Sequence, residues 1–247
     1  MINPMDLTGK HILVTGGSSG IGRQTAIQAS RLGAKVTLIA RNQEKLQKTI
    51  RDMEHPDLHA YYPFDLNDVD KIEDLIKTIV AECGQIDGLC HAAGIGNGRI
   101  LKSSKPAFVQ KMFQIHTFAF FELIRCLSLK GHLHDGASLV GISSVAAEKG
   151  NLSQGAYASA KAAMNGLLRS TAVELAPRKI RVNNVAFAMV DTEMYQDFLD
   201  YGGDPKVMQT QFLGVIDAES AANVIAFLLS DSAKFITAAV LPVYAGY

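Results

Sequence analysis

Tyr157 and Lys161 are the residues whose types and spacing most directly suggest chemistry. The segment 155–176 around them is rich in Ala and Leu and free of Pro, so we expect a helix that ends at Pro177. Residues four apart share a helix face, so the phenol and the ammonium can reach one point. A nearby ammonium lowers a phenol's pKa from about 10. The pair therefore predicts a tyrosine able to transfer protons near neutral pH.

Ser144 lies thirteen residues before Tyr157, just after the apolar run 137–142, which we interpret as a buried strand. A hydroxyl at the end of that strand could orient a substrate oxygen. The alternative is that Tyr157 packs in a core and Lys161 is solvated, because a Tyr-x-x-x-Lys pair alone is common. The functional interpretation therefore requires a cofactor site elsewhere in the chain.

A glycine-rich stretch, 16–22, joins the apolar run 10–15 to a helical pattern that continues to Leu32. In a strand–turn–helix unit, glycines let the backbone approach a pyrophosphate, which binds at the positive end of the helix. The spacing is T-G-x-x-x-G-x-G rather than the common G-x-G-x-x-G. A turn without a ligand is the alternative, but the flanking elements favour nucleotide binding.

Arg41 follows the second predicted strand, 35–40. An acidic residue there would accept hydrogen bonds from the adenosine ribose, whereas a guanidinium suits a 2′-phosphate. The position predicts that NADP(H) is preferred, with NAD(H) as the possible alternative cofactor. The other interpretation is a surface arginine that caps a loop.

Strand and helix patterns alternate through the rest of the chain. Further strands are expected at 58–64, 86–90, 180–186 and 237–243, and further helices at 67–81, 106–129 and 217–229. Such alternation predicts a parallel sheet covered on both faces. No linker or composition break divides it, so one domain is expected. The irregular, apolar segment 190–214 is a candidate substrate lid.

Composition excludes several classes of protein. Lys plus Arg equals Asp plus Glu at 24 each, which argues against a nucleic-acid or membrane partner. There is no signal-like start and no membrane-length apolar run, so we expect a cytoplasmic protein. The three cysteines fit small core residues in a reducing compartment. His132 and His134 fit a turn, and we predict no metal site.

Three signals stand in order along the chain: T-G-x-x-x-G-I-G, Asp65 after the third strand, and Ser144 with Tyr157-x-x-x-Lys161. Together they resemble the short-chain dehydrogenase/reductase family over essentially the whole chain, and most closely its 3-oxoacyl-[acyl-carrier-protein] reductase-like branch. The resemblance implies a single Rossmann-like, doubly wound α/β domain with a seven-stranded parallel sheet and helices on both faces. Residues 1–143 would mainly bind cofactor, and residues 144–247 would supply the catalytic groups and the lid.

The resemblance also implies residue roles. Tyr157 would donate a proton to a carbonyl oxygen as hydride reaches carbon, Lys161 would lower the tyrosine pKa and bind ribose, and Ser144 would hold the substrate oxygen. The positions that would contact the cofactor, besides Tyr157 and Lys161, are Gly16, Ser18, Ser19, Gly20, Ile21 and Gly22 (pyrophosphate), Arg41 (2′-phosphate), Asp65 and Leu66 (adenine), Ala93 and Gly94, and Val190 and Thr192 (nicotinamide).

Four features depart from the family pattern. His91-Ala92-Ala93-Gly94 replaces Asn-Asn-Ala-Gly, and His116 takes the place of the asparagine in the catalytic tetrad. Phe187-Ala188 replaces Pro-Gly, so a backbone that needs positive φ would have to change. The end of the sequence, Val243-Tyr244-Ala245-Gly246-Tyr247, differs from the usual Asp-Gly-Gly.

The leading hypothesis is an NADP(H)-dependent reductase of a small-molecule carbonyl, such as a 3-oxoacyl compound, working as a homodimer or homotetramer. The alternatives are a sugar or polyol dehydrogenase of the same family and a nucleotide-binding protein with little activity. Binding of acyl-carrier protein would need a basic patch at the site mouth. Its candidates are Arg125, Lys130, Arg169 and Arg178.

Overall fold

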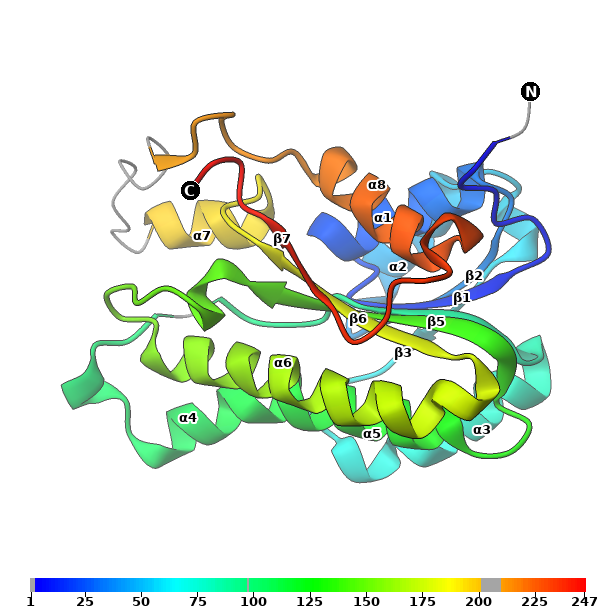
Figure 1. Cartoon of the computed structure of the whole chain (residues 1–247), viewed down its shortest axis with the longest axis horizontal. Helices are drawn as coiled ribbons and strands as arrows, with labels where there is room; N and C mark the ends of the chain where they lie inside the picture. The colour runs from blue at the N-terminus through cyan, green and yellow to red at the C-terminus, as the bar shows by residue number, and fades with distance from the viewer. Residues whose placement is uncertain (1–2, 97, 201–209) are drawn as a thin grey trace.

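The computed structural model describes residues 3–96, 98–200 and 210–247, in which strands and helices alternate (Figure 1). The strands are β1 (His11–Thr15), β2 (Lys35–Ala40), β3 (Ala60–Pro63), β4 (Ile86–His91), β5 (Leu133–Ser144), β6 (Arg181–Phe187) and β7 (Val240–Val243). The helices are α1 (Gly20–Arg31), α2 (Gln43–Arg51), α3 (Ile72–Cys83), α4 (Pro106–Phe113), α5 (Ala119–Ser128), α6 (Gly155–Leu175), α7 (Glu193–Asp200) and α8 (Ala218–Leu229).

All seven strands pair in parallel in the order β3-β2-β1-β4-β5-β6-β7. Figure 1 shows α1, α2 and α8 on one face of this sheet and α3, α4, α5 and α6 on the other. Parallel strands need crossover connections, and right-handed helical crossovers cover both faces. The predicted α/β fold, a Rossmann-like doubly wound sheet with helices on both faces, is confirmed.

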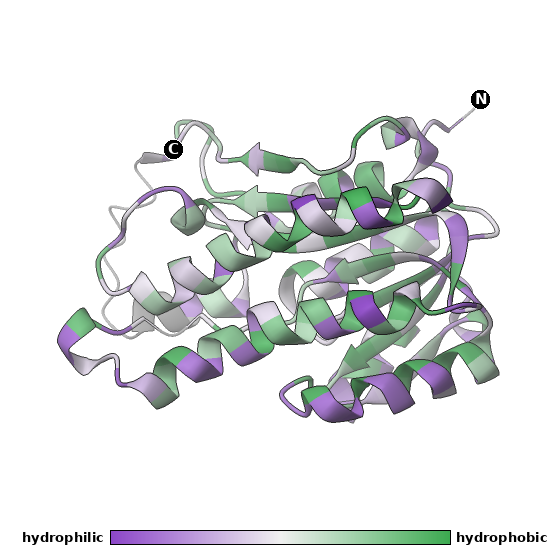
Figure 2. Ribbon diagram, turned by 60° about the horizontal axis from the view of Figure 1, so that its bottom comes forward, coloured by the Kyte–Doolittle hydropathy of each residue, from purple (hydrophilic) through white to green (hydrophobic). Residues whose placement is uncertain are grey.

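Two apolar cores lie on opposite sides of the sheet. One is built around Ile76, Leu123 and Leu168 from α3, α5 and α6. The other contains Ala26 and Ile225 from α1 and α8. In Figure 2 the hydrophobic colour follows the strands, while hydrophilic patches lie along the helices. Burial on both faces explains why the central strands are nearly continuous apolar runs.

Several predicted bounds needed correction. The sequence did not predict α2, a short polar helix that begins after Asn42, whose side chain accepts a hydrogen bond from the Lys45 amide. The third strand begins at Ala60 rather than at position 58, because Pro56–Leu58 forms a 3₁₀ turn. The third segment to change is the last strand, which begins at Val240 rather than 237.

The predicted long helix 106–129 is interrupted. Gln114–Phe118 forms a π-helical turn between α4 and α5. Apolar periodicity cannot reveal a turn that holds one extra residue, and such turns often lie at functional sites. This turn buries Ile115 and His116 together.

The remaining composition-based predictions have mixed outcomes. No helix in the described ranges is long and apolar enough to cross a membrane. Cys90 and Cys126 are buried, unpaired thiols, and Cys83 is unpaired and partly exposed. The predicted turn at the two histidines is half right: His132 lies in a turn, but His134 belongs to β5.

Candidate active site

A cavity of about 750 Å³ opens at the carboxyl ends of the strands. It lies where the strand order reverses between β1 and β4, the usual ligand position in such sheets. Every site residue predicted from the sequence lines this cavity. They are Gly16, Ser18, Ser19, Gly20, Ile21, Gly22, Arg41, Asp65, Leu66, Ala93, Gly94, His116, Ser144, Tyr157, Lys161, Val190 and Thr192.

The glycine-rich turn has the backbone that a phosphate cradle requires. Gly16 has φ +70°, and a Cβ there would lie 2.8 Å from the Ala93 nitrogen. Gly20, with φ +51°, begins α1. The N-cap residue Ser19 makes no side-chain cap hydrogen bond. The first amides of α1 therefore remain available to an anion, and the turn fits a dinucleotide pyrophosphate.

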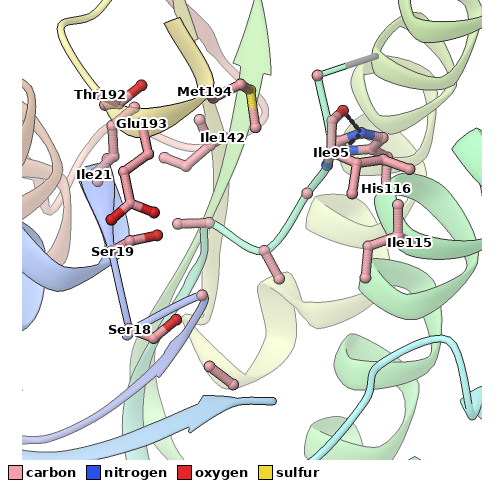
Figure 3. Close-up of a pocket in the computed structure, with 18 of the residues that line it drawn as sticks. Ser18, Ser19, Ile21, Ile95, Ile115, His116, Ile142, Thr192, Glu193 and Met194 are labelled. Carbon is pink, nitrogen blue, oxygen red and sulfur yellow. Dashed lines mark hydrogen bonds between the residues drawn. The ribbon is translucent and has the colours of Figure 1, made fainter. Parts of the chain in front are cut away.

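The end of the cavity near β2 contains both acidic and basic groups. Arg41 is exposed at the end of β2. The Asp65 carboxylate accepts two hydrogen bonds from Asn67, at 3.0 and 2.7 Å. Lys45 also lines the cavity, where its ammonium lies 3.0 Å from the Glu193 carboxylate. In Figure 3 Glu193 points from α7 toward the turn that holds Ser18 and Ser19.

Ser144, Tyr157 and Lys161 converge at the other end of the cavity. Ser144 is the last residue of β5, and its Oγ accepts a hydrogen bond from the Ala146 amide at 3.2 Å. Lys161 lies one helical turn after Tyr157, with Nζ 5.6 Å from the centre of the phenol ring. The Lys161 ammonium donates to the Ile142 carbonyl at 2.6 Å.

The sequence predicted that Lys161 would lower the pKa of Tyr157, and this prediction is wrong. Burial raises the pKa of Tyr157, and a hydrogen bond with Ser144 acts in the opposite direction. Burial also lowers the pKa of Lys161 to about 7. The lysine is therefore only partly charged at neutral pH, and desolvation dominates the tyrosine.

His116 contacts the catalytic end of the cavity through its ring. The ring packs edge-on to that of Tyr157, with centroids 5.3 Å apart at 84°. Its Nε2 lies 2.9 Å from the Ile95 carbonyl oxygen and 3.3 Å from the Ile95 nitrogen, and the shorter contact, to an acceptor, favours the proton on Nε2 (Figure 3). Burial holds the pKa of His116 well below its usual value, so the ring is neutral. Its Nδ1 is buried without a hydrogen-bond partner.

The family described as Enoyl-(Acyl carrier protein) reductase matches residues 16–247. The chain is similar to the 3-oxoacyl-[acyl-carrier-protein] reductase FabG of Thermotoga maritima, with 29% identity over 98% of this chain and 99% of that protein. It is also similar to carbonyl reductase family member 4 of Danio rerio, with 33% identity over 74% of this chain and 76% of that protein. The chain belongs to the short-chain dehydrogenase/reductase family.

Solved structures of the family superpose over nearly the full length. A short-chain dehydrogenase/reductase from Brucella melitensis, titled glucose/ribitol dehydrogenase, has 28% identity and a TM-score of 0.90, covering 98% of this chain and 97% of that one. Carveol dehydrogenase from Mycobacterium avium in complex with NAD has 27% identity and a TM-score of 0.86, covering 97% and 98%. ElxO with NADP bound has 28% identity and a TM-score of 0.86, covering 96% and 98%.

The short-chain dehydrogenase/reductase assignment makes this chain an oxidoreductase of the NAD(P)-dependent type, in a branch like that of 3-oxoacyl-[acyl-carrier-protein] reductase.

His91 departs from that family's pattern yet still connects β4 to its neighbouring strand. Its Nδ1 lies 2.9 Å from Thr15 Oγ1, and its ring stacks on Phe120 at 5.1 Å. Burial lowers the pKa of His91 to about 3. A neutral imidazole thus connects β1 to β4.

The Phe187-Ala188 departure leaves the backbone unstrained. Ala188 is absent from the residues with positive φ, and its amide donates to the Val243 carbonyl at 3.1 Å. Because the family's glycine is replaced by alanine, we expected a different backbone at this position, and Ala188 indeed adopts a φ outside the positive region. Phe187 is 3% exposed and belongs to the core on the α1 and α8 face while also lining the cavity.

Residues 190 and 192–195 of the predicted lid segment, 190–214, line the cavity. α7 occupies its first half, and Met194 packs so closely on Gly96 that a Cβ there would lie 2.4 Å from Met194 Cγ. Tyr195 is 6% exposed. Tyr201 and Met208, which the sequence placed in the lid, lie outside the described residues. The contacts of Met194 and Glu193 reach positions about 100 residues or more away, and no local signal predicted them.

None of the basic residues considered for a carrier-protein surface, Arg125, Lys130, Arg169 and Arg178, lines the cavity. Arg125 pairs with Glu73 at 2.5 Å and with Glu122 at 2.6 Å. Arg178 pairs with Asp135 at 2.8 Å. Glu73, Glu122 and Cys126 come within reach of one cation, but Arg125 already places its positive charge among them.

Proposed function

We propose that this protein is an NADP(H)-dependent reductase of a carbonyl compound. The observation that carries the proposal is the convergence of Ser144, Tyr157 and Lys161 with the glycine-rich turn in one cavity. A bound nicotinamide nucleotide would supply the hydride. Together with the fold, this arrangement supports residues 1–143 as mainly cofactor-binding and residues 144–247 as mainly catalytic, within one domain.

The chain's own groups would handle the proton. Ser144 would donate a hydrogen bond to the substrate oxygen and hold it beside the phenol. The raised pKa of Tyr157 keeps its hydroxyl protonated at neutral pH, which suits a proton donor to that oxygen. Lys161, one turn further along α6, would contact the nucleotide ribose. Because its pKa is about 7, it would also supply a proton to Tyr157 after the phenol has given its own to the substrate.

NADP(H) is the cofactor that the residues near β2 favour. Arg41 lies at the cavity with no acidic residue beside it in sequence, and its guanidinium would bind a 2′-phosphate. Related structures contain NADP in one protein and NAD in another, so NAD(H) is the alternative. The glycine turn, Asp65, Leu66, Ala93, Gly94, Val190 and Thr192 would hold the rest of the nucleotide.

A 3-oxoacyl compound is the substrate we favour. Two relatives are named a 3-oxoacyl-[acyl-carrier-protein] reductase and a carbonyl reductase, which supports a ketone substrate. Ile95, Phe187 and Met194 line the catalytic end and would accept an apolar chain better than a sugar or polyol.

We also propose an oligomeric state and a cellular location for the protein. A homodimer or homotetramer is supported by Phe118 and Phe121, which are 47% and 51% exposed on the turn before α5 and on α5. Unpaired thiols agree with the reducing cytoplasm. Sedimentation analysis would show the assembly as two or four chains, whereas a single chain would contradict it.

Loss of NADPH absorbance with a panel of 3-oxoacyl thioesters, small ketones and aldehydes tests the activity. We expect turnover with at least one carbonyl class and weaker or no NADP⁺ reduction with sugars and polyols. Turnover confined to sugars or polyols would replace the proposal with a sugar dehydrogenase. Nucleotide binding without turnover of any substrate class would favour a nucleotide-binding protein.

A further inference from the structure

Residues 244–247, here called the tail segment, fold back onto residues 145–154, which join β5 to α6 and are here called the catalytic loop. Tyr244 donates its hydroxyl to Glu148 Oε2 at 2.7 Å. Lys149 donates to the main-chain oxygen of Tyr247 at 2.6 Å and lies 4.4 Å from the centre of its ring. Two tyrosines thus hold adjacent residues of the loop.

A third contact continues into the cavity. The Tyr247 hydroxyl donates to Asn151 Oδ1 at 3.1 Å, and Asn151 Nδ2 donates to Gln154 Oε1 at 3.1 Å. Gln154 lines the cavity and precedes α6, and its carbonyl accepts from the Ala158 amide at 2.7 Å. With Asn151 donating to the Gln154 oxygen, the Gln154 amide nitrogen can donate to a ligand.

The tail segment has its own attachment, independent of the loop. The Leu213 amide donates to the Ala245 carbonyl at 3.0 Å. Gly246 lies against Phe212 so closely that a Cβ there would be 2.7 Å from the ring. In Figure 1 the end of the chain lies beside α7, above the strand ends. The tail segment is therefore attached to residues 212–213 as well as to the loop.

The catalytic loop has little packing of its own beyond Val145 and Ala146. Leu152 is 89% exposed, and Glu148, Lys149 and Gly150 are all exposed. Ser153 adopts a φ of +65°, an unfavourable conformation for a residue with a side chain. Such a loop opens readily unless contacts from elsewhere hold it.

We propose that the tail segment positions the substrate: Tyr247, through Asn151, aims the Gln154 amide into the cavity, and Tyr244 and Tyr247 together hold the loop beside Tyr157. This role rests on the proposed carbonyl reduction. Tyr247 is a positioning residue, since its hydroxyl acts on the substrate through two other side chains.

Tyr247→Phe is the direct test, because it removes the hydroxyl while keeping the ring over Lys149 and the main-chain oxygen. We expect KM for the carbonyl substrate to rise roughly 3- to 10-fold, in line with one lost hydrogen bond. The turnover number and the NADPH Kd should stay within about two-fold. Asn151→Ala should raise KM similarly, and the double variant should be no worse than either single variant.

Tyr62→Phe is the matched control, since Tyr62 donates its hydroxyl to Glu82 outside the cavity. It should leave KM unchanged. A Tyr247→Phe variant that lowers only the active fraction or the melting temperature, with KM unchanged, would reduce the tail to a structural role. Additive effects of Tyr247→Phe and Asn151→Ala on KM would also contradict the proposal that Tyr247 acts through Asn151.

Amide hydrogen exchange of the full chain separates this inference from the reaction itself. Residues 145–156 should exchange faster in Tyr247→Phe than in Tyr62→Phe, without any substrate present. Equal exchange in the two variants would contradict the proposal that the tail segment holds the catalytic loop. If the wild-type protein reduced no carbonyl compound, the proposed function would fail, whereas the exchange comparison would still decide whether the tail holds the loop.

Discussion

At the scale of single residues, burial controls the chemistry more than the spacing of charges does. Tyr157 and Lys161 share a helix face as their spacing predicts, yet the ammonium donates to the Ile142 carbonyl. The pKa of the tyrosine rises and that of the lysine falls to about 7, both mainly through desolvation. At neutral pH the Tyr157 phenol is therefore protonated and Lys161 is only partly charged, which suits Tyr157 as the proton donor.

Lys161→Met should stabilise the fold at neutral pH. An unfolded lysine titrates near 10.5 and the folded one near 7, so the unfolded chain binds more protons between these values. The cost of burying Lys161 is thus full below pH 7 and disappears toward pH 10.5. At about 1.4 kcal/mol per pH unit, the Met variant should gain on the order of a few kcal/mol at pH 7.

Urea unfolding of both proteins from pH 6 to pH 10 measures this difference. The gain of the Met variant should stay constant up to about pH 7 and then shrink as the pH rises toward 10. A Met variant that is less stable at pH 7, with a difference independent of pH, would show that Lys161 is not destabilised by burial.

Arg41→Leu should weaken NADPH binding about 10- to 100-fold and leave NADH binding nearly unchanged, because a charge-assisted contact to the 2′-phosphate is lost. Nucleotide fluorescence titration measures both values. Lys48→Gln is the matched control, since Lys48 is exposed on α2 but does not line the cavity. Equal losses for NADPH and NADH would reject Arg41 as the phosphate ligand.

At the scale of elements, the sequence predicted what local patterns determine. The glycine turn, the end of β5 at Ser144 and the helix of Tyr157 follow from residues close together in the chain. The helix α2 was missed because its sequence is short and mostly polar. The π-helical turn was missed because one inserted residue barely changes apolar periodicity. Contacts such as Lys45 with Glu193 or Tyr247 with Asn151 join distant positions, and single-sequence patterns do not encode them.

His91→Ala should destabilise the sheet by about 2–4 kcal/mol, because it removes the bond to Thr15 and leaves a cavity beside Phe120. The loss should be constant above about pH 7 and shrink as the pH falls from 6.5 to 5, because the unfolded histidine takes up a proton near 6.5 whereas the folded one does so only near 3. Chemical denaturation measures it, with the exposed His134→Ala as control. A loss that grows as the pH falls toward 5 would mean that His91 is charged there.

At the scale of the whole molecule, one cavity joins the two halves of the chain. Its walls come from the strand ends β1 to β6, from the π-helical turn and from α6 and α7. The family relationship extends over nearly the full length of several solved structures. The departures at His91, Ala188 and the tail segment are each accommodated by hydrogen bonds within the fold.

The central claim is that Tyr157 donates the proton during NADPH-dependent reduction of a carbonyl. The most direct measurement compares wild-type and Tyr157→Phe for turnover of the best carbonyl substrate and for NADPH affinity. The account predicts a loss of at least about 100-fold in turnover, as for a lost general acid, with NADPH Kd changed by no more than about three-fold. A Tyr157→Phe variant with undiminished turnover would contradict it.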